Sequence, residues 1–236
     1  MRPILALTLI LAVLYGGYWF VGAGTVESRA RAELAALDAR GWEVQYDTLD
    51  TRGFPSRFDT TVTDLSLSSP DGLFSYAAPF VQAFALSYRP NRLIVVFPPE
   101  QDMVLSGRPM TLGAVDMRMS ASVRASTDLP FEAATLTVES PTLTGDGQPD
   151  TSAENILVAA RHVEETEATY DLYAKADDLT LPPEVLSGLG AADTLPPRID
   201  SVTLALRAAL DAPLDRLAAQ RPPLIQTLAL DGTAMQ

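Results

Sequence analysis

The feature that most constrains the fold is a change in the spacing of apolar residues near Trp42. Between Thr25 and Arg40 these residues recur every three or four positions, the period of an α-helix, and Gly41 is placed to cap its C-terminus. Beyond Trp42 they recur every second position, which is the period of a strand with one buried face. The sequence therefore predicts a short helix followed by a mainly β, antiparallel domain.

Alternation is clearest from Met117 to Ala125, where apolar residues occupy the odd positions and Arg or Ser the even ones. Segments 134–138 and 170–177 alternate in the same way, and each is predicted to be a half-buried strand. From Phe80 to Tyr88 the bulky apolar residues are at even positions, and Pro90-Asn91 then separates this segment from a second apolar run. This pattern predicts a hairpin.

A short unit with two aliphatic residues on one strand face recurs along the chain. Its copies are Asp64-Leu65-Ser66-Leu67, Thr135-Leu136-Thr137-Val138, Asp178-Leu179-Thr180-Leu181 and Thr227-Leu228-Ala229-Leu230. Two interpretations stay open. Either the unit recurs by chance among the short strands of a sandwich or barrel, or it is one amphipathic strand repeated along an open curved sheet with a groove. Pro183 to Leu189 and Ala212 to Gln220 do not alternate and are expected to form short helices or irregular caps.

The N-terminus begins with twenty uncharged residues from Ile4 to Ala23. As a helix rising ~1.5 Å per residue, this run is about 30 Å long, the thickness of a bilayer core. A cleaved signal peptide is the alternative, with a small-residue site ending at Ala23. Tyr15, Tyr18 and Trp19 fit an interfacial aromatic belt and extend the run beyond the length of a signal peptide, which favours an uncleaved anchor.

We therefore divide the chain into a transmembrane signal-anchor (residues 1–24), a helical stalk (25–41) and a periplasmic β-rich domain (42–236). A short tail before a single apolar span favours an N-terminus in the cytoplasm. The expected location is the inner membrane, crossed once, with the domain in the periplasm.

Composition and motifs exclude several kinds of function. Acidic residues outnumber basic ones 30 to 17, and a net charge of -13 repels phosphate backbones, so no nucleic-acid partner is expected. The chain has no cysteine, which rules out disulfides and thiolate sites. Its single histidine, His162, lies in strand phase and has no accompanying catalytic or phosphate-binding motif.

Two acidic segments are also expected to lack chemistry. Glu164, Glu165 and Glu167 fit a solvated turn better than a pair of catalytic carboxylates. The segment 146–150 with Glu154 lacks the third-position ligand of a calcium loop. We expect no catalytic residue, no cofactor and no metal site.

The remaining candidate is the apolar face of the strands. One face of a single sheet needs a second layer or a ligand to cover it. Sheet-on-sheet packing gives a closed core, whereas an uncovered face gives a groove for an acyl chain. The candidate groove residues are Phe80, Phe84, Leu86, Tyr88, Met117, Met119, Val123, Leu136 and Val138.

Several proline-containing motifs carry a family resemblance, together with the N-terminal anchor. They are Gly53-Phe54-Pro55, Phe97-Pro98-Pro99, Leu181-Pro182-Pro183 and Leu195-Pro196-Pro197. The chain resembles an uncharacterised bacterial envelope family, domain of unknown function 2125, whose architecture is similar to AsmA-like proteins. The resemblance implies a periplasm-facing membrane protein in lipid transport or envelope maintenance, and it supplies no catalytic residues. The chain stops at Gln236, earlier than this family leads us to expect, so a short or truncated member is expected.

Three functional hypotheses follow. The first is a membrane-anchored β-domain that binds or shields lipid acyl chains through an apolar face. The second is a structural or assembly partner of a membrane complex, with the β-domain packed shut. An enzyme is the third and the least favoured.

Overall fold

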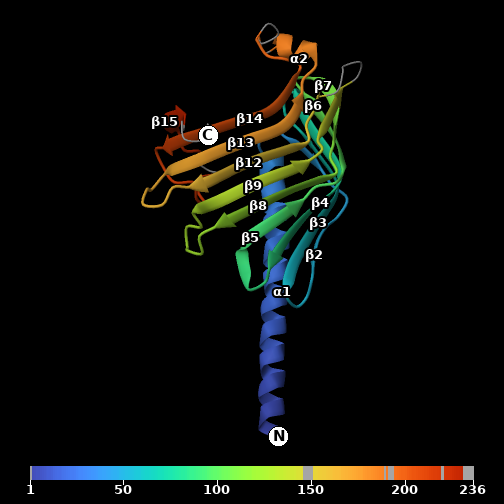
Figure 1. Cartoon of the computed structure of the whole chain (residues 1–236). Coiled ribbons are helices and arrows are strands. Elements are labelled where there is room, and N and C mark those ends of the chain that lie inside the picture. Colours follow the sequence, from blue (N-terminus) through green and yellow to red (C-terminus); the bar gives the residue numbers. More distant parts are fainter. Residues whose placement is uncertain (1, 146–150, 189, 191–193, 219–220, 231–236) are drawn as a thin grey trace.

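The computed structural model describes residues 2–145, 151–188, 190, 194–218 and 221–230. Within them, one sheet of 15 strands follows one long N-terminal helix (Figure 1). Every strand pairing is antiparallel. The prediction of a mainly β, antiparallel fold preceded by an apolar helix is confirmed.

Helix α1 (Arg2–Asp38) is continuous through the apolar run and the predicted stalk, and it is long and apolar enough to span a membrane. It ends at the predicted cap. Gly41 has a φ of 87°, and its N–H donates to the Asp38 carbonyl at 2.9 Å. The N–H of Trp42 donates to the Leu37 carbonyl at 3.2 Å, so the two bonds form a Schellman cap.

One stripe of α1 packs against the domain. Trp19 and Ala23 are buried, and Gly16, Val26, Ala30 and Leu34 are half-buried at helical spacing. The stripe contacts β1 (Glu43–Gln45), β2 (Leu49–Arg52) and β3 (Arg57–Ser68). The stalk segment is therefore docked on the sheet along its length.

The strands follow one another across the sheet in chain order, because the shorter elements are halves of longer bent strands. β5 continues into β6, β7 into β8, β9 into β10 and β11 into β12. Their bounds are β4 Phe74–Leu86, β5 Arg89–Val96, β6 Glu100–Leu105, β7 Arg108–Gly113, β8 Asp116–Val123, β9 Phe131–Glu139, β10 Thr142–Gly145, β11 Thr151–Ser152, β12 Asn155–His162, β13 Thr169–Thr180, β14 Arg198–Leu210 and β15 Ile225–Leu230. Figure 1 shows the resulting sheet curving away from β2 and β3, beside α1, toward β13 and β14.

Three residues with left-handed backbone mark the bend in the sheet. They are Asp64 in β3, Ser140 between β9 and β10, and Asp178 in β13, with φ values of 49°, 48° and 52°. In β3 the more buried positions are even before Asp64, at Phe58 and Thr60, and odd after it, at Leu65. The residue at the bend thus shifts the alternation by one position and keeps the apolar side chains on one face.

This bend gives a physical meaning to two of the recurring units in the sequence. Asp64-Leu65-Ser66-Leu67 and Asp178-Leu179-Thr180-Leu181 each begin at the left-handed residue. Aspartate tolerates this conformation better than a β-branched residue does, because its short side chain avoids the clash with the following carbonyl.

Two local predictions differ in detail from the structure. The β4–β5 hairpin forms, but Leu86 pairs with Arg89, so its turn is Ser87-Tyr88 and Pro90-Asn91 lies within β5. Of the two irregular segments, the first forms α2 (Pro183–Gly188), and the described part of the second consists of turns and bends.

Candidate functional site: an apolar sheet face

The structure places the single histidine in a packing role. The His162 ring lies 5.5 Å from the Tyr170 ring in an edge-on arrangement. Across the described residues, no group of three or more His, Asp or Glu side chains is arranged to hold a metal ion. The segment 146–150, considered above as a calcium loop, lies outside the described residues.

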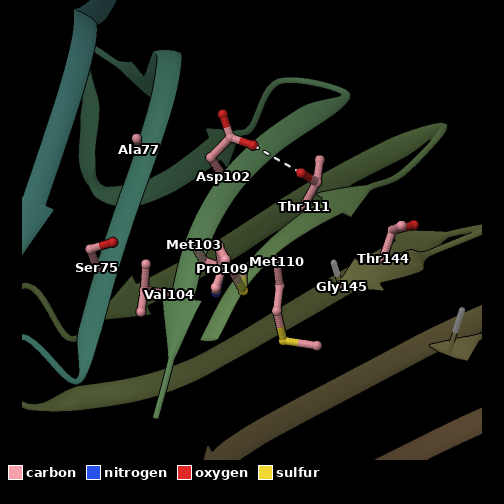
Figure 2. Close-up of a pocket in the computed structure, with 10 residues that line it drawn as sticks. All are labelled: Ser75, Ala77, Asp102, Met103, Val104, Pro109, Met110, Thr111, Thr144 and Gly145. Atoms are coloured by element: carbon pink, nitrogen blue, oxygen red, sulfur yellow. Dashed lines mark hydrogen bonds between the residues drawn. The ribbon is translucent and has the colours of Figure 1, made fainter. Parts of the chain in front are cut away.

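The hollow in Figure 2 lies between β4, β6, β7 and β10 and has a volume of about 580 Å³. Among the described lining residues, Asp102 is the one charged side chain, and it accepts a hydrogen bond from the Thr111 hydroxyl at 3.0 Å. Its other lining residues are Ser75, Ala77, Met103, Val104, Pro109, Met110, Thr144 and Gly145. The described residues of the hollow give this carboxylate no basic partner and so no acid–base pair, which makes the hollow a weak candidate for catalysis.

The strand register divides the side chains of the sheet between two faces. Phe58 is opposite Ala85 and is buried against Trp19 of α1, so its face is called the helix-side face. Residues directly opposite one another in antiparallel strands share a face. One complete row across the helix-side face is Thr60, Ala83, Val95, Met119, Leu136, Val158, Ala174 and Leu204.

The neighbouring rows of the helix-side face are equally apolar. One contains Met117, Val138, Ile156, Ala176 and Val202, and the other contains Leu93, Ala121, Ala134, Ala160, Leu172 and Leu206. None of these three rows includes an ionisable side chain. A face of this composition suits hydrocarbon and offers nothing to a charged ligand.

The opposite face, called the outer face, is charged and internally paired. Asp171 lies between Arg207, with a 2.7 Å contact, and Arg161, with a 3.2 Å contact. The hydrogen bond from Arg207, then that from Arg161, lowers the pKa of the Asp171 carboxyl against the opposing effect of desolvation. Lys175 and Asp177 form another pair at 2.9 Å. The β12–β14 part of the outer face thus carries paired surface charges, which are typical of a solvated surface.

The side chains of the helix-side face differ in how far they are exposed to solvent. Val95 and Val138, in the middle of the sheet, are 8% and 7% exposed. Val158 and Leu204, nearer the β14 side, are 42% and 45% exposed. The contacts of α1 are with β1, β2 and β3, so the described helix does not cover the β12–β14 part of this face. At one end of β13 and β14, Tyr170 and Ala208 are nevertheless buried, at 3% and 5% exposed.

The structure does not bring the nine predicted groove residues together on one surface. Met117, Met119, Leu136 and Val138 lie on the helix-side face. Phe80 and Phe84 pair with Thr63 and Asp59 and so lie on the outer face. Leu86, which pairs with Arg57, lies on the same face at the C-terminal end of β4. Tyr88 is in the exposed turn after β4, and Val123 lies beyond a register shift, opposite Phe131.

The exposed aliphatics of the helix-side face on β12, β13 and β14 were not among the nine predicted groove residues. They are Val158, Leu172, Val202 and Leu204. The signal that marks them is the same two-residue alternation, which runs from Val202 to Ala208 with an apolar residue at each even position.

Comparison with known proteins identifies the family. The chain matches, over residues 19–233, a family described as uncharacterised protein conserved in bacteria, DUF2125. It belongs to this family. A search of curated proteins finds no match to the chain. The resemblance to DUF2125 is confirmed, whereas the similarity to AsmA-like proteins stays a prediction. The description of the family names no reaction and no ligand.

Proposed function

We propose that this DUF2125 protein is a membrane-anchored envelope protein that binds lipid acyl chains on the helix-side face of β12, β13 and β14. The observation that supports this proposal is the row Val158, Ala174 and Leu204, which is uncharged and is partly exposed to solvent at Val158 and Leu204. Large exposed apolar patches on soluble domains mark interaction sites. Hydrocarbon is the ligand chemistry that this surface suits.

The dimensions of the face agree with an extended acyl chain. Strands are spaced ~4.8 Å apart, so β12 to β14 span about 10 Å across the row. Each methylene removed from water on this surface contributes about 0.8 kcal/mol. A chain lying across three or four strands would thus be held by many small contacts, without a polar anchor on the face itself.

Helix α1 supplies the route to lipid in this proposal. It spans the inner membrane once, with its N-terminus in the cytoplasm and the β-domain in the periplasm. Lipid transport or envelope maintenance, the roles implied by the AsmA-like resemblance, would use the same face to shield an acyl chain from water.

A charge placed on the face tests the proposal. Leu204→Asp should abolish the phospholipid that remains bound to the full chain after detergent purification, as measured by mass spectrometry of an organic extract. Because Leu204 is 45% exposed, the fold should keep its melting temperature. Thr203→Asp is the matched control, since Thr203 is the preceding residue, pairs with Lys175 on the outer face and should retain the lipid. Equal lipid content in the two variants would contradict the proposal.

A protein partner is the second candidate, because β15 forms an exposed edge of the sheet. All six of its residues are exposed, including Ile225, Leu228 and Leu230. Edge strands with apolar side chains can accept a strand from another chain. If the purified protein holds no lipid and instead carries a stoichiometric protein partner that Leu228→Asp releases, docking replaces lipid binding as the function.

A further inference from the structure

The first contacts between α1 and the β-domain lie unusually far toward the N-terminus of the helix. The Tyr15 hydroxyl donates to the Pro55 carbonyl at 3.0 Å and lies 3.0 Å from the Ser87 hydroxyl. The Tyr18 hydroxyl donates to the Ser87 carbonyl at 2.5 Å, and the Trp19 indole N–H donates to the Arg57 carbonyl at 2.7 Å. The loop 53–57 and the turn 86–89 are thereby fixed beside residues 15–19.

This attachment leaves too little free helix to cross a bilayer alone. Residues 2–14 have a length of about 20 Å at ~1.5 Å per residue, whereas the hydrocarbon core is ~30 Å thick. If the whole apolar run from Ile4 to Ala23 spans the membrane, Tyr15 lies about 12 Å inside the bilayer, measured along the helix from the end of the run at Ala23. The loop and turn attached at Tyr15 must then enter the outer part of the same leaflet.

The side chains at this lower edge suit such a position. Phe54, at the tip of the loop, is 55% exposed, and Tyr88, in the turn, is 65% exposed. Phe54 stacks on Phe20 of the helix with ring centroids 5.8 Å apart. Exposed aromatic residues next to an apolar helix are typical of the membrane interface.

Three arginines stand beside these aromatic residues. Arg57, Arg89 and Arg92 line a hollow of about 550 Å³ on the outer face of β3–β5, and its apolar part is formed by Phe84, Ala85, Leu86 and Ile94. Arg57 pairs with Asp59 at 2.9 Å. The side chains of Arg89 and Arg92 have no hydrogen-bond or ion-pair partner among the described residues, and β4 and β5 contain no acidic residue. A chain of net charge -13 thus presents a cationic patch where it meets the membrane.

We propose that this lower edge, defined by Phe54, Tyr88 and the hollow of Arg57, Arg89 and Arg92, inserts into the leaflet and binds the phosphate of an anionic phospholipid. Guanidinium groups match phosphate oxygens in geometry and charge. The apolar residues of the hollow receive the first part of the lipid chains. The inference rests on the membrane anchorage in the proposed function, but it concerns a different surface from the acyl-binding face.

Insertion depth can be measured because the chain has no native cysteine. A spin label on Tyr88→Cys, in the full chain reconstituted into phosphatidylcholine–phosphatidylglycerol nanodiscs, should be accessible to oxygen and protected from a water-soluble nickel chelate. A label on Thr203→Cys, on the outer face of β14, should show the reverse. Equal nickel accessibility of the two labels would overturn the insertion.

Headgroup binding is tested by native mass spectrometry of protein released from the same mixed nanodiscs. The wild-type chain should retain phosphatidylglycerol in preference to phosphatidylcholine. Each arginine near an anionic surface contributes about fivefold, so Arg89→Gln with Arg92→Gln should lower this preference about 25-fold. The control, Arg118→Gln with Arg161→Gln, removes the same charge from the outer face farther along the sheet and should keep the preference. Equal behaviour of the two double variants would refute the site.

Failure of the anchorage itself would be seen separately. If alkali extracts the wild-type chain from vesicles, the membrane anchor of the proposed function is wrong and the edge site fails with it. If the chain resists extraction while the Tyr88 label stays exposed to nickel, the anchor stands and the edge insertion alone is refuted.

Discussion

Trp19 joins α1 to the sheet, and its removal should separate helix from domain. The side chain is 5% exposed, its ring centroid lies 5.9 Å from that of Phe58, and its indole N–H donates to the Arg57 carbonyl. Replacing a buried tryptophan by alanine costs about 3–5 kcal/mol through lost contacts and the cavity left behind. Trp19→Ala should therefore remove a large part of a typical stability of ~5–15 kcal/mol.

The assay is thermal and urea unfolding of the full chain in detergent micelles. For a domain of this size, a loss of 3–5 kcal/mol lowers the melting temperature by on the order of 10 °C. Val21→Ala is the matched control, because Val21 is two residues away on the same helix and is 72% exposed. It should change the unfolding free energy by less than about 0.5 kcal/mol. Similar losses for the two variants would show that the indole does not hold the helix against the sheet.

Three further predictions concern the domain. At the bend residue Asp178, the Asp178→Val variant should be less stable than the Asp178→Asn variant by about 1–2 kcal/mol in urea unfolding. Both substitutions remove the ion pair with Arg198, but only valine is strained at a φ of 52°. Equal stability of the two variants would contradict the role of the bend. The lowered pKa of Asp171 gives stability that is present above its unfolded pKa and lost as pH falls through the folded value, so Asp171→Asn should be less stable than wild type at pH 7, and the difference should shrink as the pH is lowered below the unfolded pKa. Burial raises the pKa of Tyr76 to about 12, so its share of stability is lost as pH rises from about 10 through 12, and Tyr76→Phe should remove the latest step in an alkaline ultraviolet titration.

Much of the fold could be predicted because a half-buried strand needs strict alternation. The segment from Met117, the segment 134–138 and the segment 170–177 coincide with β8, β9 and β13. Gly41 could be placed because a helix end needs a residue that accepts positive φ. The turn between β4 and β5 was misplaced because Pro90 is tolerated inside a strand when its missing N–H is not needed for pairing.

The candidate site was less predictable because β4 carries apolar residues on both faces. The bulky residues Phe80 and Phe84 looked like the core-facing set, but the smaller Ala83 and Ala85 share the helix-side face with Phe58. Phe58 meets α1 at Gly22, where an added Cβ would lie 2.7 Å from its ring, so the helix approaches this part of the sheet closely. Which face of β4 lies on the side of the helix therefore follows from the packing of α1 on Phe58 of the neighbouring strand β3. Similarly, the hydrogen bonds of Tyr15 and Tyr18 to the lower edge follow from tertiary contacts that no local pattern contains.

The central claim is that lipid occupies the helix-side face of β12–β14. A photo-crosslinking amino acid can be placed at Leu204 on that face or at the next residue, Ala205, which pairs with Tyr173 on the outer face. After illumination in native membranes, mass spectrometry of the full chain should find phospholipid joined to position 204 and none joined to position 205. Equal lipid labelling at both positions, or labelling at neither, would contradict the account.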